Sequence, residues 1–312
     1  MKKNIIGIDI GGTNIKAAFL SGHAIKHRSK TPSLAERGLD SSLQQITSAI
    51  RPLHREAHAI GIGIAGIIDS RNGVVKYSPN LKGWNNIPLA RMIRNEFKIP
   101  CRIINDVNAI LLGEWKYGRA QGHSNAFLFT MGTGVGGAAV CEGKLLFGAN
   151  GFAGEFGHTT INPNGPKCVC GQRGHLERYA GAKYIAARYM RKMKRQKRSL
   201  KRQQTLTPET IARAAKMGDP VARQVFSEIG YYIGLGVANI LALFDPDIVI
   251  ISGGIARAGK ILFDPIRKTV RDSVLGAEHR HYEIVPAILG DDAGILGAAL
   301  FATLSLRSTN LE

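Results

Sequence analysis

Two glycine-rich segments constrain the fold of this chain most strongly. Residues 7–16 and 129–138 each consist of an apolar run, a glycine-rich turn that carries a threonine, and a second apolar run. This pattern predicts two β-hairpins. The turn of such a hairpin exposes backbone N–H groups that no side chain covers, so it can hold phosphate oxygens. Two turns of this kind predict two related lobes that bind one nucleotide together.

The length and composition set outer limits on the class of protein. A chain of 312 residues is long enough for two domains, each with its own core. We find no apolar run long enough to cross a bilayer and no secretory signal at the start, so we expect a cytoplasmic, soluble protein without a membrane partner. The four cysteines, Cys101, Cys141, Cys168 and Cys170, are too few for a disulfide framework.

The charge balance is strongly basic. The sequence holds 42 basic and 23 acidic residues, a formal net charge of +19, and eight of the twelve residues in 191–202 are basic. Such charge attracts polyanions. The run contains no aromatic side chain that could stack on a base. A solvated helix end or mobile insertion is therefore the favoured interpretation, and we expect no nucleic-acid partner.

Both halves of the sequence alternate strands with helices, which predicts an α/β protein with two wound sheets. In the first half we expect strands at 4–10, 15–21, 24–30, 59–65 and 102–105, and helices at 38–55, 88–97 and 106–117. In the second half we expect strands at 125–131, 135–141, 144–147 and 247–251, an irregular stretch at 148–174, helices from there to 243, and a last helix that starts from an aspartate cap at 291.

Seven motifs in a fixed order resemble the ROK family of sugar kinases and repressors, within the actin, hexokinase and Hsp70 fold group. They are residues 9–13, 78–81, 105–109, 132–137, 154–158, 168–177 and 252–254. The resemblance implies a two-lobed, actin-like ATPase (ribonuclease H-like) α/β fold with the active site in the interlobe cleft. The N-terminal lobe would span 1–118 and the C-terminal lobe 119–312, with the option that the last helix packs on the N-terminal lobe.

The resemblance also implies ATP-dependent phosphorylation of a hexose, with Asp106 as the general base. Asp106 follows a short strand and precedes a helix, so it lies at the edge where α/β sheets bind ligands. Phosphoryl transfer needs a group that orients the hydroxyl and accepts its proton. The alternative is an aspartate that only caps the helix. Polar side chains suit the hydroxyls of a sugar, and the implied sugar ligands are Asn80, Asn105, Asp106, Glu155, His158 and Glu177.

ATP and Mg²⁺ are the implied cofactors of the two glycine-rich turns. A carboxylate at Asp9 would repel ATP unless a cation lay between them, which assigns Asp9 to Mg²⁺; a turn-capping aspartate is the alternative. Gly253 and Gly254 would approach the adenine or ribose closely. The implied nucleotide-binding residues are Asp9, Gly11, Gly12, Thr13, Asn14, Lys16, Gly132, Thr133, Gly134, Val135, Gly136, Gly253 and Gly254.

A second constellation, His158, Cys168, Cys170 and His175, fits a structural zinc site. Two cysteines and two histidines within eighteen positions suit a closed tetrahedral Zn²⁺ site. Similar proteins have cysteine at the position of His175, and imidazole can replace thiolate as a ligand. The zinc would orient His158 toward the sugar. A metal-free loop held by packing is the alternative.

Residues 78–81 and Gly83-Trp84 resemble the glucokinase members of the family more than its N-acetylmannosamine kinases. Glucose is therefore the expected substrate, with N-acetylglucosamine, N-acetylmannosamine or fructose kinase as alternatives. A sugar-responsive regulator is a rival from another class. The family's repressors carry an added N-terminal helix-turn-helix segment, whereas the phosphate motif begins here at residue 7, which favours the enzyme. Similar proteins are often homodimers, and we expect one here.

Overall fold

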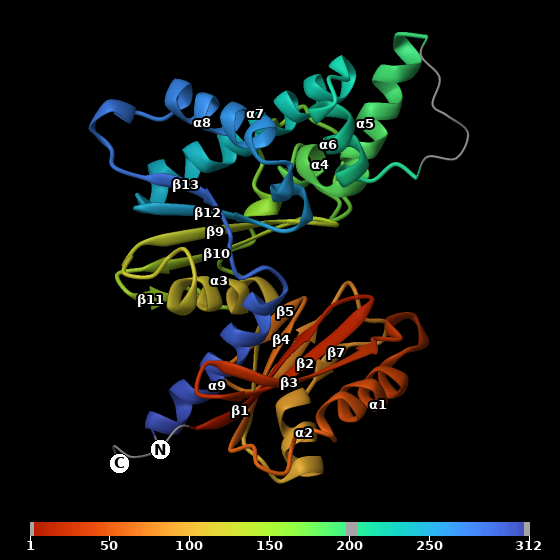
Figure 1. Ribbon diagram of the computed structural model, residues 1–312, viewed down its shortest axis with the longest axis vertical. Helices are drawn as coiled ribbons and strands as arrows, with labels where there is room; N and C mark the ends of the chain where they lie inside the picture. The colour runs from red at the N-terminus through yellow and green to blue at the C-terminus, as the bar shows by residue number, and fades with distance from the viewer. Residues whose placement is uncertain (1–2, 198–204, 309–312) are drawn as a thin grey trace. The chain divides into compact units, whose positions relative to one another are not determined.

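The computed structural model describes residues 3–197 and 205–308, which form two compact units (Figure 1). Unit 1 comprises Met1–Gln121, Phe147–Ala153 and Ile288–Glu312, and unit 2 comprises Gly122–Leu146 and Gly154–Ala287. This division differs from a single boundary at 118/119, because the chain returns to unit 1 for two later segments.

Unit 1 is built on a five-stranded sheet with the order β3-β2-β1-β4-β8. Its strands are β1 (Asn4–Ile10), β2 (Asn14–Ser21), β3 (Ala24–Pro32), β4 (Ala59–Ile64) and β8 (Cys101–Asn105). β1, β2 and β3 pair antiparallel, whereas β4 runs parallel to β1 and β8 parallel to β4. The carboxyl ends of β1, β4 and β8 therefore meet at one edge of the sheet.

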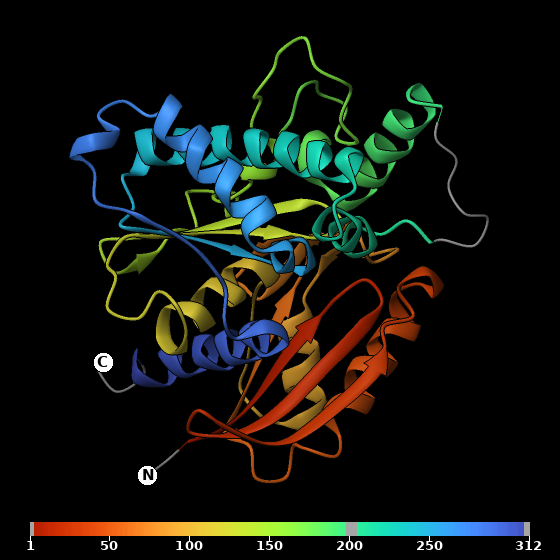
Figure 2. The ribbon, with the colours of Figure 1, turned by 45° about the horizontal axis from the view of Figure 1, so that its top comes forward.

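Helices cover both faces of this sheet (Figure 2). Alternate β1 residues such as Ile6 and Ile8 pack with residues of α1 (Leu39–Ile50) and α2 (Leu89–Phe97), while Ile5 packs with residues of α9 (Ala293–Ser308). α3 (Asp106–Tyr117) lies along α9 (Figure 1). A Cβ on Gly7 would collide with the carbonyl of Ile295, so a glycine on this face lets α9 approach the sheet.

A fully buried carboxylate, Glu114 of α3, binds the segment that leads into α9. Its Oε1 accepts hydrogen bonds from the backbone N–H groups of Ile288 at 2.9 Å and Leu289 at 2.8 Å, and its Oε2 accepts one from Arg119 at 2.9 Å. Three donors satisfy the buried charge. The link to Ile288 and Leu289 could not be predicted, because these residues lie more than 170 positions from Glu114 in the sequence.

Unit 1 also holds a small antiparallel sheet between residues 65 and 88, where the sequence analysis placed no strand. Its strands are β5 (Ile67–Asp69), β6 (Val74–Tyr77) and β7 (Asn85–Ile87). Strands of three or four residues are too short to show an alternating pattern. The sheet leads directly into the segment 78–85.

Unit 2 repeats the sheet of unit 1 with the order β11-β10-β9-β12-β13. Its strands are β9 (Ala126–Met131), β10 (Val135–Cys141), β11 (Lys144–Leu145), β12 (Ile248–Ser252) and β13 (Glu283–Pro286). β9 and β10 form a hairpin, and β12 runs parallel to β9. β13, with a half-exposed, mixed sequence, was not predicted. The two-sheet α/β fold predicted from the sequence is confirmed.

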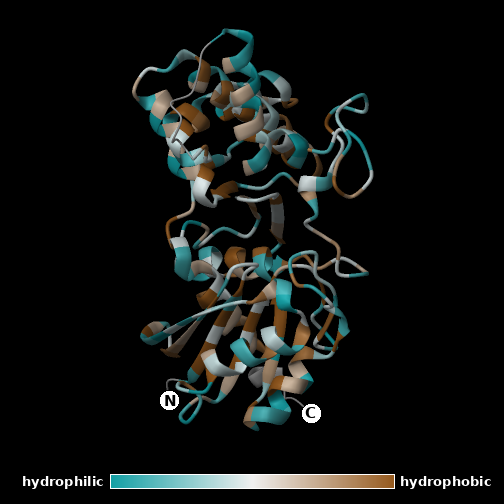
Figure 3. Cartoon of the chain, turned by 90° about the vertical axis from the view of Figure 1, so that its right-hand side faces the viewer, coloured by the Kyte–Doolittle hydropathy of each residue, from teal (hydrophilic) through white to brown (hydrophobic). Residues whose placement is uncertain are grey.

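The helices of unit 2 pack on this sheet, and apolar residues concentrate on the strands and inward helix faces (Figure 3). They are α4 (Glu177–Ala180), α5 (Ala182–Arg195), α6 (Pro208–Lys216), α7 (Pro220–Phe244) and α8 (Lys260–Ser273).

Short 3-10 turns occur in both units. They are η1 (Ala35–Arg37), η2 (Phe156–His158), η3 (Gly254–Ala258), η4 (Ala277–His279) and η5 (Gly290–Asp292). α9 thus begins at Ala293, after η5 rather than at 291.

α7 contradicts the expectation that no apolar run could span a membrane. Its 25 residues are long and apolar enough by length and composition. However, 61% of its most apolar 18-residue window is buried inside the protein. We therefore assign α7 as the core helix of unit 2. Of the basic run, residues 191–195 belong to α5, whereas 198–202 lie outside the described residues.

Candidate active site

The first glycine-rich turn joins β1 to β2 in unit 1. The N–H of Gly11 donates to the carbonyl of Asn14 at 3.0 Å, and the hydroxyl of Ser33 donates to the carbonyl of Gly12 at 2.7 Å. Gly12 and Thr13 are exposed. A Cβ on Gly12 would lie 3.6 Å from the Cβ of Asn80, so the exposed Asn80 lies beside this turn. The turn presents backbone N–H groups to solvent next to a polar side chain.

A half-buried carboxylate, Asp9, lies at the end of β1, directly before this turn. Asp9 pairs with Lys16 across the hairpin, and the Nζ of Lys16 lies 3.1 Å from a carboxylate oxygen of Asp291. Burial raises the pKa of Asp9, Lys16 opposes this rise, and Asp291 adds to it. A bound cation would relieve the cost of this charge. Asp291, which sequence reasoning had treated only as a helix cap, belongs to the same charged group.

Asp106 is the first residue of α3, directly after β8. The cap of α3 is the preceding residue, Asn105, whose Oδ1 accepts hydrogen bonds from the N–H groups of Val107 at 2.9 Å and Asn108 at 3.2 Å. The Nδ2 of Asn105 donates to the carbonyl of Gly66 at 3.0 Å. Asn105 is thus the N-cap of α3, while Oδ1 of Asp106 also accepts a hydrogen bond from the N–H of Val107 at 3.0 Å. One amide hydrogen of Asn105 remains for a ligand.

The second glycine-rich turn joins β9 to β10 in unit 2. The N–H of Gly132 donates to the carbonyl of Gly134 at 3.0 Å, and Gly132 and Thr133 are exposed. β12 ends beside it, because Ser252 pairs with Thr130 of β9. The predicted nucleotide residues of this unit therefore lie together at one end of the sheet, after the carboxyl ends of β9 and β12 and at the start of β10. They are Gly132, Thr133, Gly134, Val135, Gly136, Gly253 and Gly254.

Glu155, His158 and Glu177 lie near this turn in unit 2. A Cβ on Gly157 would collide with the carbonyl of Val135, so glycine lets η2 pack directly on β10. The N–H of Val135 donates to Oε2 of Glu177 at 3.3 Å. Burial raises the pKa of Glu155, an effect that His158 opposes and Glu177 reinforces.

The loop after η2 brings together His158, Cys168, Cys170 and His175. A β-bridge pairs Thr160 with His175. The four potential ligand atoms all lie within 4.8 Å of one another. The Nδ1 atoms of the two histidines are 3.3 Å apart, Cys168 Sγ lies 3.9 Å from Nδ1 of His158, and Cys170 Sγ lies 3.2 Å from Nδ1 of His175.

These distances fit the donor set of a zinc ion. Tetrahedral Zn²⁺ with ordinary Zn–N and Zn–S bonds places its ligand atoms about 3.3–3.8 Å apart. The two sulfur–nitrogen distances, 3.9 Å between Cys168 and His158 and 3.2 Å between Cys170 and His175, both lie close to that range. Burial raises the pKa of the Cys168 thiol and lowers the pKa of His175, and a metal would favour the thiolate and neutral imidazole instead. The residues present can hold the ion that the sequence predicted.

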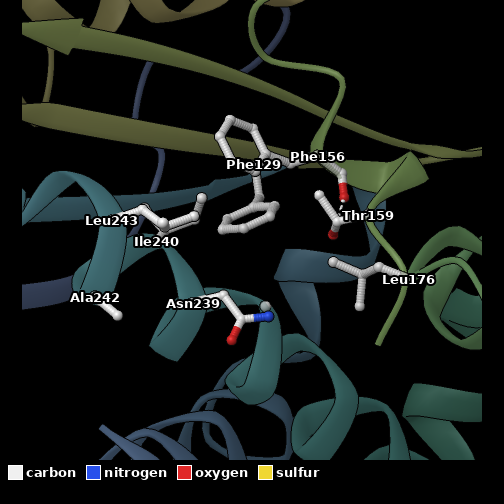
Figure 4. Close-up of a pocket in the computed structure, with 9 residues that line it drawn as sticks. Phe129, Phe156, Thr159, Leu176, Asn239, Ile240, Ala242 and Leu243 are labelled. Atoms are coloured by element: carbon white, nitrogen blue, oxygen red, sulfur yellow. Dashed lines mark hydrogen bonds between the residues drawn. The ribbon is translucent and has the colours of Figure 1, made fainter. Parts of the chain in front are cut away.

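An apolar pocket of about 290 Å³ lies between this loop and the C-terminal part of α7 (Figure 4). Phe156 forms part of its wall and stacks edge-on against Phe127, with ring centroids 4.4 Å apart. The hydroxyl of Thr159 donates to the carbonyl of Phe156 at 2.8 Å. The lining residues are Phe129, Phe156, Thr159, Leu176, Gly236, Asn239, Ile240, Ala242 and Leu243, none of which is charged. The pocket wall thus helps to hold the loop that carries His158.

The two sheets have the same strand order, and in each a glycine-rich turn follows the carboxyl end of the central strand. This arrangement defines an actin-like nucleotide-binding protein of two lobes. The family model for the ROK family matches residues 5–304. The chain therefore belongs to the ROK family.

The chain is similar to glucokinases and to a repressor. It is 38% identical to a glucokinase of Thermotoga maritima over 96% of both chains. A crystal structure of a ROK family glucokinase from Streptomyces griseus in complex with glucose and AMPPNP has 32% identity and a TM-score of 0.81, and covers 96% of this chain and 99% of that one. A xylose repressor of Bacillus spizizenii is 32% identical over 94% of this chain and 75% of the repressor.

Proposed function

We propose that the protein is an ATP-dependent sugar kinase that phosphorylates glucose at its 6-hydroxyl. The observation that carries this proposal is the position of Asp106 at the carboxyl end of β8, while its neighbour Asn105 does the capping. That edge is also the edge of the first glycine-rich turn, because β1, β4 and β8 are parallel. The similarity to glucokinases supports the proposal.

In the proposed mechanism, Asp106 accepts the proton of the attacking sugar hydroxyl. The backbone N–H groups at the tips of the two turns, those of Gly12, Thr13, Thr133 and Gly134, would hold phosphate oxygens, and Lys16 adds a positive charge beside the first turn. Asp9 would hold Mg²⁺, which when bound offsets the charge of the phosphates. A carboxylate base suffices, because phosphoryl transfer through a loose transition state depends mainly on position and charge.

The sugar hydroxyls would be bound by Asn80, Asn105, Glu155, His158 and Glu177. Glu155 and Glu177 offer carboxylate acceptors, and each hydroxyl of a sugar can donate to one. A site built from such groups rejects an epimer, because a missing hydroxyl leaves a buried polar group without a partner.

Zinc would be held by His158, Cys168, Cys170 and His175 as a structural ion. His158 and His175 would bind through Nδ1, the atoms that face the two cysteines. The Nε2 of His158 then remains to donate to the sugar. In this proposal the loop positions a sugar ligand and takes no part in the chemistry.

The substrate is tested by ADP release over a panel of glucose, mannose, fructose, N-acetylglucosamine and N-acetylmannosamine. We expect the highest kcat/KM for glucose, because a pocket shaped for the bare 2-hydroxyl excludes an acetamido group. A higher value for an acetamido sugar or for fructose would reassign the substrate and leave the phosphate chemistry unchanged.

A sugar-responsive regulator is the second candidate, favoured by the similarity to xylose repressors and by the net charge of +19. Asp106 and both glycine-rich turns favour the enzyme over it. A cytoplasmic homodimer without a membrane or nucleic-acid partner completes the proposal, and its oligomeric state is measurable by light scattering.

A further inference from the structure

Glu209, on the first turn of α6, places its carboxylate beside Gly254. Gly254 is one of the residues of unit 2 that we propose to bind the nucleotide. A Cβ on Gly254 would lie 2.7 Å from Oε1 of Glu209. Gly254 follows β12, and β12 pairs with the strand that leads into Gly132. One carboxylate therefore lies beside the glycines at the carboxyl ends of neighbouring strands.

The first turn of α6 is held in place by its own cap. The hydroxyl of Thr207 accepts a hydrogen bond from the N–H of Thr210 at 3.2 Å, and the hydroxyl of Thr210 accepts one from the N–H of Thr207 at 3.0 Å. This reciprocal pair is a capping box. Ile211 and Ala215 of α6 share the buried core with Ile255 of η3, which fixes α6 against the segment that contains Gly254.

The carboxylate of Glu209 remains available to a ligand. The side chain is exposed and has no hydrogen-bond or ion-pair partner within residues 3–197 and 205–308. Nearby basic residues of the same elements, Arg213, Lys216 and Arg257, are also exposed. A lone carboxylate among cations, at an edge suited to an anionic nucleotide, would weaken binding by charge alone. It is consistent with nucleotide binding only if it forms a specific hydrogen bond.

We propose that Glu209 determines nucleotide specificity by accepting a hydrogen bond from a ribose hydroxyl. A carboxylate is an acceptor without a donor, and ribose hydroxyls are donors. Phosphates at residues 132–136 would leave the attached ribose near the next strand end, about 4.8 Å away, where Gly253 and Gly254 leave space. Carboxylates recognise ribose hydroxyls at this edge of other α/β sheets. This inference rests on the proposed nucleotide function.

The test compares ATP with 2′,3′-dideoxy-ATP, which lacks both ribose hydroxyls. Binding of each nucleotide with Mg²⁺ is measured by calorimetry for the wild type, Glu209→Ala and Glu209→Gln. We expect Glu209→Ala to weaken ATP binding about tenfold and to leave dideoxy-ATP binding unchanged or tighter. Glu209→Gln keeps a neutral acceptor and should fall between the wild type and Glu209→Ala. The KM for each nucleotide should follow the same order while kcat is retained.

The expected loss has the opposite sign to a simple charge effect, since removal of a negative charge alone would tighten ATP binding. Glu278→Gln, which removes an exposed carboxylate on η4, is the matched control and should leave both affinities unchanged. If Glu209→Ala lost the same affinity for ATP and for dideoxy-ATP, or lost none for either, the ribose contact of Glu209 would be overturned. The proposed kinase function would be unaffected. A wild type that binds neither nucleotide would refute the proposed function and the ribose contact together.

Discussion

At the scale of single residues, Asn105 and Asp106 divide two tasks that a sequence motif cannot separate. Asn105 is the N-cap of α3 through two accepted hydrogen bonds, and Asp106, the first residue of the helix, accepts one from the N–H of Val107 through Oδ1. Asp106→Asn should lower kcat about 10²–10⁴-fold and leave glucose affinity within a few-fold, because the amide keeps the shape but cannot accept the proton. Steady-state kinetics and calorimetry measure the two quantities. Lys116→Gln, at an exposed position of the same helix, is the folding control. More than a tenth of wild-type kcat in Asp106→Asn would exclude Asp106 as the general base.

Asp9 illustrates a residue whose function costs stability. Burial raises its folded pKa above the ordinary value of 3.8. The folded state therefore binds the proton more tightly than the unfolded state, and stability declines as pH rises through the folded pKa. Asp9→Asn removes this cost, so without ligand its Tm at pH 7.5 should exceed that of the wild type, by about 2–4 °C for each kcal/mol relieved.

The same substitution should lower kcat/KM at least about 100-fold, because the proposed Mg²⁺ ligand is lost. The difference in Tm should shrink as the pH falls, because the wild-type carboxyl takes up its proton at a pH above the ordinary pKa of an aspartate. Thermal melts from pH 4 to 8 measure this. A wild type more stable than Asp9→Asn at pH 7.5 would show that Lys16 outweighs the burial of Asp9.

At the scale of elements, the loop that carries His158, Cys168, Cys170 and His175 tests whether histidine can replace cysteine as a zinc ligand. His175→Cys should retain one zinc per chain and full activity, since thiolate and imidazole both bind zinc. His175→Ala should lose the metal, raise the KM for glucose through a disordered His158, and lower Tm. Elemental analysis with melts reports on the site independently of activity. A metal-free, fully active wild type would show a loop held by packing on Phe156 instead.

Long and periodic elements could be predicted from the sequence, whereas distant pairings could not. α3 occupies 106–117, as its pattern of apolar residues predicted, and β10 occupies 135–141. β13 was missed because it is short and half-exposed, so its place depends on pairing with β12. The site residues within one loop could be named, but Asp291 and Glu209 could not, because folding rather than sequence proximity brings them to Lys16 and Gly254.

At the scale of the whole molecule, the two sheets share one order of strands. In each unit a three-strand meander begins with the glycine-rich hairpin, and two later strands add in parallel beyond its first strand. Repeats of one topology place equivalent turns at equivalent sheet edges. This explains how two motifs far apart in the sequence could predict both glycine-rich turns.

The net charge of +19 also belongs to the whole molecule, and it predicts how nucleic acid would bind. In a mobility-shift assay at 50 mM salt, any short duplex should be retained equally, whatever its sequence, because only phosphates are contacted. Between 50 and 200 mM salt the affinity should fall about 10³-fold or more if six or more phosphates are neutralised. Replacement of the exposed Lys194 and Arg195 of α5 by glutamine should weaken this retention without changing the KM for glucose. A complex that selects one sequence and survives 200 mM salt would instead favour the regulator, because charge alone cannot distinguish one duplex from another.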